Sequence, residues 1–150
     1  MNEDASIEFL ILANHIEAIN GLLYISGGGW TDLHRPIIPN QGMLITHFGI
    51  GISILVPWDQ TNREHSLSIN VEDADGIAIL TAPPAPITVG RPPTLALGSE
   101  QHAIVALGID FTFPRTGSYR VVARLNDRDE RTWGFRIHDV TAAAPVPNAP

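Results

Sequence analysis

The chain has 150 residues, 44% of them hydrophobic and 17% charged, which suits one packed domain and argues against wholesale disorder. Its formal net charge of −7 argues against binding to nucleic acid, because neutralisation of phosphates by basic side chains drives that binding. The absence of cysteine excludes disulfides, thiolate-bound zinc and a thiol nucleophile.

The amino-terminal residues Met1 to Asp4 include two acids where a secretory signal would carry basic residues. The apolar run at residues 9–13 is far shorter than the roughly 18 residues that a membrane helix needs. We therefore expect a cytoplasmic protein that does not enter a membrane.

The first third of the chain predicts a β-hairpin. Residues 7–19, an apolar run broken by Asn14, His15 and Glu17, and the apolar residues 22–25 flank Asn20-Gly21, a pair that tolerates the positive φ angles of a type I′ turn. A helix over residues 7–18 is the competing interpretation, and the turn together with the β-branched residues favours the strand. Gly27 to Gly29 then predict a bulge that turns Trp30 back onto the sheet. The alternative, a glycine loop that binds an anion, is disfavoured because no helix follows whose amino terminus could assist.

The middle of the chain continues with short strands. Residues 44–54 and 65–71 alternate apolar and polar positions, and a shorter strand is expected at residues 77–81. Prolines crowd residues 82–94, so we expect a sheet edge or a surface loop there.

The clearest alternation lies near the carboxyl end, in residues 103–113, 119–125 and 133–137. Side chains of a strand point to opposite faces with period two, so this pattern predicts three antiparallel strands that bury one face. The predicted core residues there are Phe111, Phe113, Tyr119, Trp133 and Phe135.

These segments give about eight strands and no convincing helix. The fold class predicted is all-β, an antiparallel β-sandwich that occupies residues 1–140. Residues 141–150 are rich in Ala and Pro and are expected to form a flexible tail.

Three segments carry a family resemblance: Ala13 to Trp30 (ANHIEAINGLLYISGGGW), His65 to Gly76 (HSLSINVEDADG) and Phe111 to Asp127 (FTFPRTGSYRVVARLND). Together they resemble a small uncharacterised family of bacterial, largely actinobacterial, single-domain proteins. The resemblance implies a β-sandwich and brings no established activity, so it assigns no functional residue. The chain departs from the family in having Asn126-Asp127 where a plain Asp-Gly turn is usual.

A structural role is predicted for Tyr119, which follows Gly117 at the start of a strand. The spacing resembles the tyrosine corner of β-sandwiches, in which the hydroxyl hydrogen-bonds to nearby backbone.

The polar face of the last strands carries Arg120, Arg124 and Arg136, with Val122 and Val140 among them. Arginine with apolar neighbours is typical of contact surfaces, so these residues form a candidate interaction face. The alternative is ordinary cross-strand pairing of each arginine with an acidic residue.

A candidate ligand or Ca²⁺ site combines Trp30 with the acidic turn that holds Glu72, Asp73 and Asp75. Carboxylates suit Ca²⁺ and an aromatic ring could stack on a sugar, but the EF-hand spacing is absent. An ordinary Asp-Gly turn is the favoured interpretation, and no metal or cofactor is expected.

Six histidines are many for this length, yet none shows the local spacing of a zinc site. His47, His102 and His138 lie on polar faces of predicted strands and could converge if those strands are neighbours. Ser53 lacks the glycine pattern of a nucleophile elbow.

Function follows mainly by exclusion. The preferred hypothesis is a non-enzymatic interaction or assembly module that binds a protein partner or a second copy of itself. The alternative is a small-ligand domain that binds a sugar or Ca²⁺. A hydrolase is the third hypothesis, and it requires a histidine and an acid that converge in a cleft.

Overall fold

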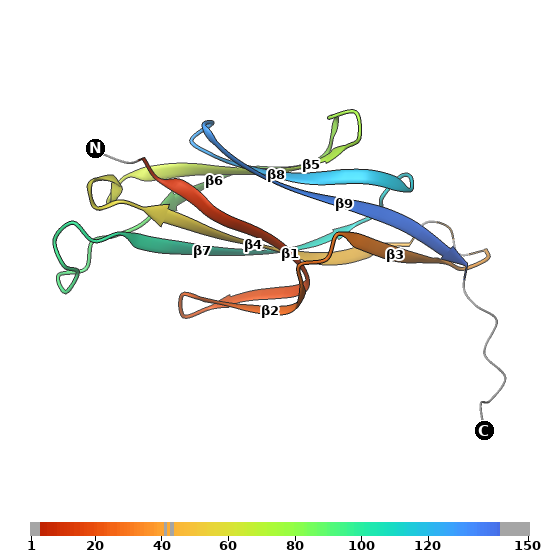
Figure 1. Ribbon diagram of the computed structural model, residues 1–150, viewed down its shortest axis with the longest axis horizontal. Helices are drawn as coiled ribbons and strands as arrows, with labels where there is room; N and C mark the ends of the chain where they lie inside the picture. Colours follow the sequence, from red (N-terminus) through yellow and green to blue (C-terminus); the bar gives the residue numbers. More distant parts are fainter. Residues whose placement is uncertain (1–3, 41, 43, 142–150) are drawn as a thin grey trace, which may run out of the picture.

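The computed structural model describes residues 4–40, 42 and 44–141, and these form two packed β-sheets with no α-helix (Figure 1). A four-stranded sheet has the order β2-β1-β4-β7, and a five-stranded sheet has the order β3-β9-β8-β5-β6. The strands are β1 (Ser6–Ile19), β2 (Leu22–Gly28), β3 (Asp32–Ile37), β4 (Thr46–Val56), β5 (Glu64–Asp73), β6 (Ala78–Thr88), β7 (Gln101–Phe111), β8 (Gly117–Leu125) and β9 (Asp129–Thr141). The predicted all-β sandwich is confirmed, with nine strands in place of about eight.

One sheet edge differs from the antiparallel prediction. β3 pairs with β9 in parallel, in a register that runs from Asp32 opposite Arg136 to Ile37 opposite Thr141. The chain crosses from β2 in the four-stranded sheet to β3 in the five-stranded sheet. β3 therefore pairs with β9 and does not form a hairpin with β2. Residues 32–37 lack an alternating pattern, and for this reason the sequence did not predict this strand.

The predicted group of three antiparallel strands is divided between the two sheets. β8 and β9 pair antiparallel as expected, whereas β7 pairs with β4 in the other sheet. The prediction was wrong here because alternation identifies the buried face of a strand and does not identify its neighbour. The proline-rich β6 is the last strand of its sheet, so the expected edge is confirmed.

Aromatic side chains fill the core between the sheets. Phe48 and Phe113 are completely buried, and their ring centroids lie 6.1 Å apart. Phe135 packs edge-on against Phe113 at 5.7 Å. The predicted core residues Phe113, Tyr119 and Phe135 are buried, while Phe111 and Trp133 are partly buried against the same cluster. The core prediction is therefore confirmed for Phe113, Tyr119 and Phe135, whereas Phe111 and Trp133 lie at the margin of the core.

Tyr119 forms the predicted tyrosine corner. Its hydroxyl donates a 2.6 Å hydrogen bond to the carbonyl of Arg115 and lies 3.3 Å from the Arg115 amide nitrogen. Gly117 adopts a φ of 131°, which favours glycine at the turn into β8. This contact fixes the segment that crosses from the four-stranded sheet to the five-stranded sheet.

The hairpin of β1 and β2 covers part of the outer face of the four-stranded sheet. The predicted Asn20-Gly21 turn is present, with φ angles of 51° and 76°. β1 pairs with β4 as far as Ala13 opposite Gly49, and beyond that point its residue Ile16 lies against Gly49 and Gly51. Figure 1 shows β2 below β4 and β7, apart from the two main layers.

The described residues contain no helix of the length and apolarity needed to cross a membrane. Of the predicted tail, Thr141 ends β9, and residues 142–150 lie outside the part of the chain that the structure describes.

A side chain at Gly49 should displace the hairpin. A Cβ atom there would lie 2.9 Å from the backbone nitrogen of Ile16, which cannot move without the strand. We predict that Gly49→Ala lowers the free energy of unfolding by about 1–3 kcal/mol in urea denaturation. Gly134→Ala is the control, because a Cβ there meets no atom within 4 Å. Equal stability of the two variants would contradict the close approach of β1 to β4.

Removal of the Tyr119 hydroxyl should weaken the corner. We predict that Tyr119→Phe lowers the free energy of unfolding by about 1 kcal/mol, because the Arg115 carbonyl loses its hydrogen bond. Tyr24 is 53% exposed, so Tyr24→Phe should leave the thermal midpoint unchanged. An unchanged midpoint in both variants would show that the corner does not contribute to stability.

Candidate functional site

The outer face of the five-stranded sheet gathers the three predicted arginines. The inward residues of β8 and β9 include Tyr119 and Phe135, so alternation places Arg120, Arg124 and Arg136 on the opposite side of the sheet. We call the outward residues of β3, β8 and β9 the arginine face. Val122 also belongs to this side but is only 2% exposed, so it adds little apolar surface.

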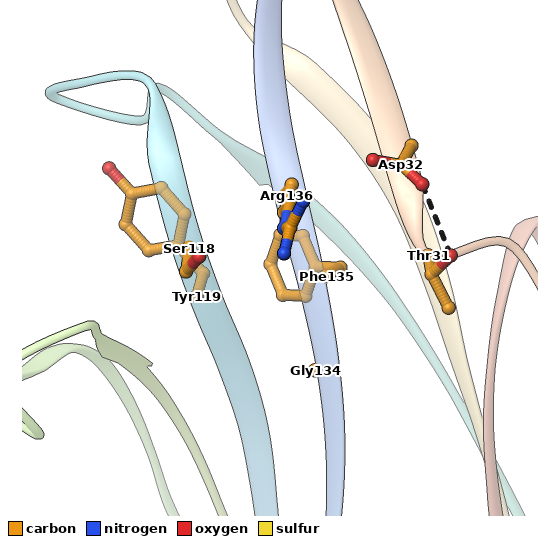
Figure 2. Close-up of a pocket in the computed structure, with 7 residues that line it drawn as sticks. All are labelled: Thr31, Asp32, Ser118, Tyr119, Gly134, Phe135 and Arg136. Carbon is orange, nitrogen blue, oxygen red and sulfur yellow. Dashed lines mark hydrogen bonds between the residues drawn. The ribbon is translucent and has the colours of Figure 1, made fainter.

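A hollow of about 320 Å³ opens on this face between β3, β8 and β9. Arg136 lies between Ser118 of β8 and Asp32 of β3 in the strand register, and Figure 2 shows it in this central position. Gly134 contributes no side chain, which leaves room beside the guanidinium. The lining residues are Thr31, Asp32, Ser118, Tyr119, Gly134, Phe135 and Arg136.

A second hollow of about 510 Å³ adjoins the first along the same strands. Ser118 and Arg136 line both hollows, so the Arg136 side chain stands between them. His138 and Gly117 belong to the second hollow. The face thus offers one guanidinium that a bound group can reach from two sides.

The arginines of this face differ in their partners. The Arg120 Nε donates a 2.6 Å hydrogen bond to the Glu72 carboxylate of β5, and the side chain of Glu72 is only 11% exposed. This contact is the cross-strand pairing that the sequence left as the alternative. Arg124 lies opposite Glu130 in the register. Within the described residues the Arg136 guanidinium donates no hydrogen bond, and it acts on Asp32 only through its charge.

Asp32, His138 and His34 form a polar group at the edge of the arginine face. The His138 Nε2 lies 2.7 Å from the Asp32 carboxylate, and the rings of His34 and His138 stack with centroids 5.1 Å apart. The hydrogen bond from His138 lowers the pKa of Asp32, with smaller contributions from Thr31 and the charge of Arg136 and an opposing effect of burial. Sequence patterns missed this group because β3 was not predicted as a strand.

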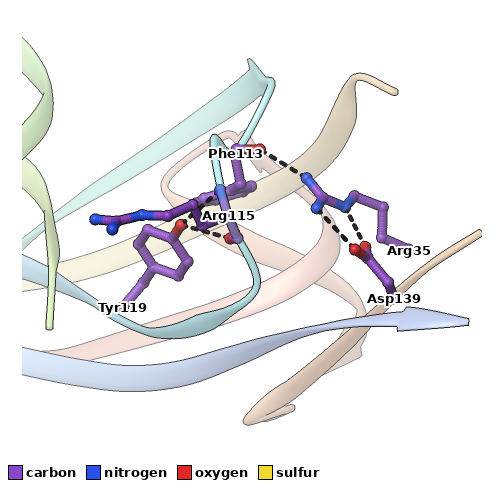
Figure 3. A network of polar contacts seen from close by, with 5 residues as sticks. All are labelled: Arg35, Phe113, Arg115, Tyr119 and Asp139. Atoms are coloured by element: carbon purple, nitrogen blue, oxygen red, sulfur yellow. Dashed lines mark hydrogen bonds and ion pairs between the residues drawn. The ribbon is translucent and has the colours of Figure 1, made fainter. Parts of the chain in front are cut away.

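The position of β3 depends on a contact that we call the Arg35 clamp. The Arg35 guanidinium holds both carboxylate oxygens of Asp139 on β9, at 2.7 and 3.3 Å, and donates a 2.7 Å hydrogen bond to the Phe113 carbonyl (Figure 3). These hydrogen bonds lower the pKa of Asp139, against the opposing effect of burial. The clamp therefore joins the strand that carries Asp32 to the core.

The residues of the predicted ligand site contact different parts of the protein. Trp30 packs edge-on against Phe48 and Phe135, with ring centroids 6.0 and 5.8 Å apart, and lines a third hollow of about 510 Å³. Glu72 is paired with an arginine, as described above. The Asp73 carboxylate accepts hydrogen bonds from the backbone of Asp75 and Ile77 within its own turn.

The three histidines that the sequence allowed to converge are separated, and each pairs with an acidic residue. His47 pairs with Asp110 at 2.7 Å and His102 pairs with Glu8 at 3.0 Å, both on the four-stranded sheet, whereas His138 lies on the other sheet. Within residues 4–40, 42 and 44–141, no three His, Asp or Glu residues are grouped so as to hold a metal ion. The charge pairs on this sheet are exposed and lie outside the arginine face.

The arginine face carries groups whose chemistry suits a carboxylate ligand. Arg136 offers a forked set of donors, and Ser118 adds a hydroxyl beside it. The Asp32–His138 couple resembles part of a catalytic arrangement, but no hydrogen bond joins Ser118 to His138 in the described part of the chain.

The two packed sheets define a β-sandwich protein, and the hollow beside Arg136 opens on the outer face of its five-stranded sheet. The chain belongs to a family described as "family of unknown function (DUF6941)", whose model matches residues 8–138. The resemblance to an uncharacterised family is thus confirmed, and its bacterial origin stays a prediction.

None of the curated proteins matches the chain. Among solved structures, the chain is similar to Pseudomonas fluorescens alkylpurine DNA glycosylase AlkC bound to DNA containing an abasic site analog, with 9% identity over 90% of this chain and a TM-score of 0.48. The chain spans about 30% of that protein's length. A likeness this slight carries no argument about function.

The Arg35 clamp predicts a loss of stability in acid. A carboxylate whose pKa is lowered by folding stabilises the protein above its unfolded pKa of about 3.9, and this contribution is lost as the pH falls through the folded value. We predict that Asp139→Asn is less stable than the wild type at pH 7 and loses less stability between pH 5 and pH 2. Urea denaturation at each pH measures the effect.

The control for this prediction is Asp75→Asn, at an exposed position in the turn after β5. Its pH profile should run parallel to that of the wild type. If Asp139→Asn also runs parallel to the wild type, the clamp does not contribute to stability through its charge.

Proposed function

We propose that this protein is a non-enzymatic interaction module of the bacterial cytoplasm that binds a carboxylate-bearing segment of a protein partner on its arginine face. The observation that carries the proposal is Arg136, whose guanidinium stands between two hollows without a hydrogen-bond partner among the described residues. Arginine is preferred at contact surfaces because its planar donors match a carboxylate in two parallel hydrogen bonds.

The setting of Arg136 supports this proposal. Strands on both sides fix the backbone, and the Arg35 clamp fixes the outer one of them, so a bound group would meet a rigid surface. Asp32 is already bonded to His138 and Thr31, which leaves the Arg136 donors available to an external acid. On a chain with a net charge of −7, such a cationic position also selects where an acidic segment can dock.

Hydrolysis is the second candidate, and the Asp32–His138 couple beside Ser118 is the observation that favours it. Binding is favoured over hydrolysis because a base within hydrogen-bond reach usually activates a nucleophilic serine, and no hydrogen bond joins Ser118 to His138 among the described residues. The open face also admits water freely, which weakens the electrostatic stabilisation of a transition state.

The binding proposal is tested by titrating the ¹⁵N-labelled protein with the peptide tri-glutamate and recording amide shifts. We predict shifts at Ser118, Gly134 and Arg136 that disappear in Arg136→Ala. The stability of this variant should stay within about 0.5 kcal/mol of the wild type, because Arg136 donates no hydrogen bond within the described residues.

The matched control is Arg63→Ala. Arg63 is exposed and directly precedes β5. The last residue of β5, Asp73, pairs with Tyr119 next to Ser118, so Arg63 lies at the far end of β5 from Ser118. This variant should keep the shifts of the wild type. Shifts that persist in Arg136→Ala, or that follow every arginine equally, would overturn the proposal. Capture of partners from a bacterial lysate by both variants then identifies which proteins depend on Arg136.

A further inference from the structure

β7 ends the four-stranded sheet with a long edge that no other strand of the described residues occupies. It has eleven residues, pairs only with β4 and contains neither proline nor a basic residue other than His102. Natural sandwiches usually protect such edges, because unpaired backbone N–H and C=O groups on a flat strand accept a further strand.

The other edges of this protein are protected in ways that β7 is not. β6 contains Pro83, Pro84 and Pro86, which cannot donate a backbone hydrogen bond. β3 has only six residues and contains Pro36. β2 has seven residues and ends in two glycines. The sequence therefore restricts strand addition at β6 and β3 and leaves β7 as the longest edge able to accept a strand.

The core is open to solvent along this edge. The inward residues of β4 are completely buried, whereas the inward residues of β7, including Val105, Leu107 and Ile109, are only partly buried. An apolar hollow of about 360 Å³ lies between β7 and β6, with Leu107 and Ile109 on one side and Val71 and Leu80 on the other. A strand added to β7 would cover these side chains.

The sequence of β7 is complementary to itself in one antiparallel register. When two copies of β7 pair about Ala106, all eleven residues find a partner, from Gln101 opposite Phe111 through Ala106 opposite itself. In this register His102 of one copy faces Asp110 of the other, and this happens twice. Ile104 of one copy faces Gly108 of the other, and the missing side chain of the glycine leaves space for the large isoleucine side chain.

Neighbouring registers lose this complementarity. A shift of the axis to Leu107 places Ile104 opposite Asp110, and a shift to Val105 places His102 opposite Gly108. Opposed residues of paired strands have Cβ atoms about 4.5–5.5 Å apart, so charges and sizes that face each other interact directly.

The charged ends of β7 are already part of short networks within the chain. The His102 Nδ1 contacts Glu8 at 3.0 Å, and one oxygen of Asp110 contacts His47 at 2.7 Å. The His102 ring and the Asp110 carboxylate are about half and two thirds exposed, so each presents a second polar atom to a facing strand. Pairing of two copies would place acidic residues and histidines alternately in one row, with Glu8 and His102 from one copy followed by Asp110 and His47 from the other.

We propose that this protein forms a two-fold symmetric dimer in which β7 pairs with β7 of a second copy, centred on Ala106. The two four-stranded sheets then become one continuous sheet of eight strands. The surface differs from the arginine face, so the dimer and the binding of an acidic partner are independent of each other. The interface is isologous, as expected for a closed dimer.

The absence of cysteine from the chain allows a direct test of the register. In the proposed dimer the two copies of Ala106→Cys face each other at a distance that a disulfide spans. The copies of Ile104→Cys are separated by four residues along the strand, about 13 Å, which a disulfide does not span. We expect mild oxidation to cross-link Ala106→Cys at least tenfold faster than Ile104→Cys. Ile104→Cys/Gly108→Cys should cross-link as Ala106→Cys does.

A charge exchange provides the second measurement, made on variants whose thermal unfolding confirms the fold. Asp110→Arg replaces the carboxylate that faces His102 by a guanidinium at each end of the interface, and it should raise the dissociation constant of the dimer roughly tenfold in analytical ultracentrifugation. His102→Glu/Asp110→Arg places a carboxylate opposite a guanidinium at each end and should recover dimerisation. A wild-type protein that stays monomeric at millimolar concentration, or equal cross-linking at residues 104 and 106, would overturn the proposal.

Discussion

Phe113 is the residue through which the two sheets, the turn before β8 and the strand β3 are held together. Its ring is buried and packs against Phe48 of one sheet and Phe135 of the other. It also contacts the ring of Tyr119, whose hydroxyl fixes the same crossing segment. Its carbonyl accepts a hydrogen bond from Arg35. A single position therefore links burial of apolar surface, the largest favourable contribution to folding, to the polar contacts that place the arginine face.

This linkage holds an exposed strand face in a defined geometry, as the proposed binding surface requires. β3 is short and lies at a sheet edge, a place where strands fray easily. The Arg35 clamp joins it both to β9 and to the core, so Asp32 is held next to His138 and Arg136. The charges of the face are thus held in fixed positions, and this preorganisation would lower the entropic cost of the proposed binding.

Much of the fold could be predicted from the sequence because alternation directly reports which side of a strand is buried. The strands around Phe48 and Tyr119, the Asn20-Gly21 turn and the tyrosine corner follow from this pattern and from turn chemistry. The order of strands in the sheets could not be predicted, because it depends on contacts between segments far apart in the chain. The Asp32–His138 pair was missed for the same reason: it needs a parallel β3, whose polar sequence has no strand pattern.

The two outer faces of the sandwich differ in what covers them, and the two candidate surfaces, the arginine face and the β7 edge, belong to different sheets. The β1–β2 hairpin covers the four-stranded sheet over Gly49 and Gly51, whereas the outer face of the five-stranded sheet stays open around Arg136. The proposed pairing through β7 would extend the first sheet in its own plane. The two-fold axis of such a pair would be perpendicular to that plane, so both five-stranded sheets would lie on the same side of the proposed dimer. Their arginine faces would then point in the same direction, and a partner with two acidic segments could engage both at once, which would raise its apparent affinity without any new contact.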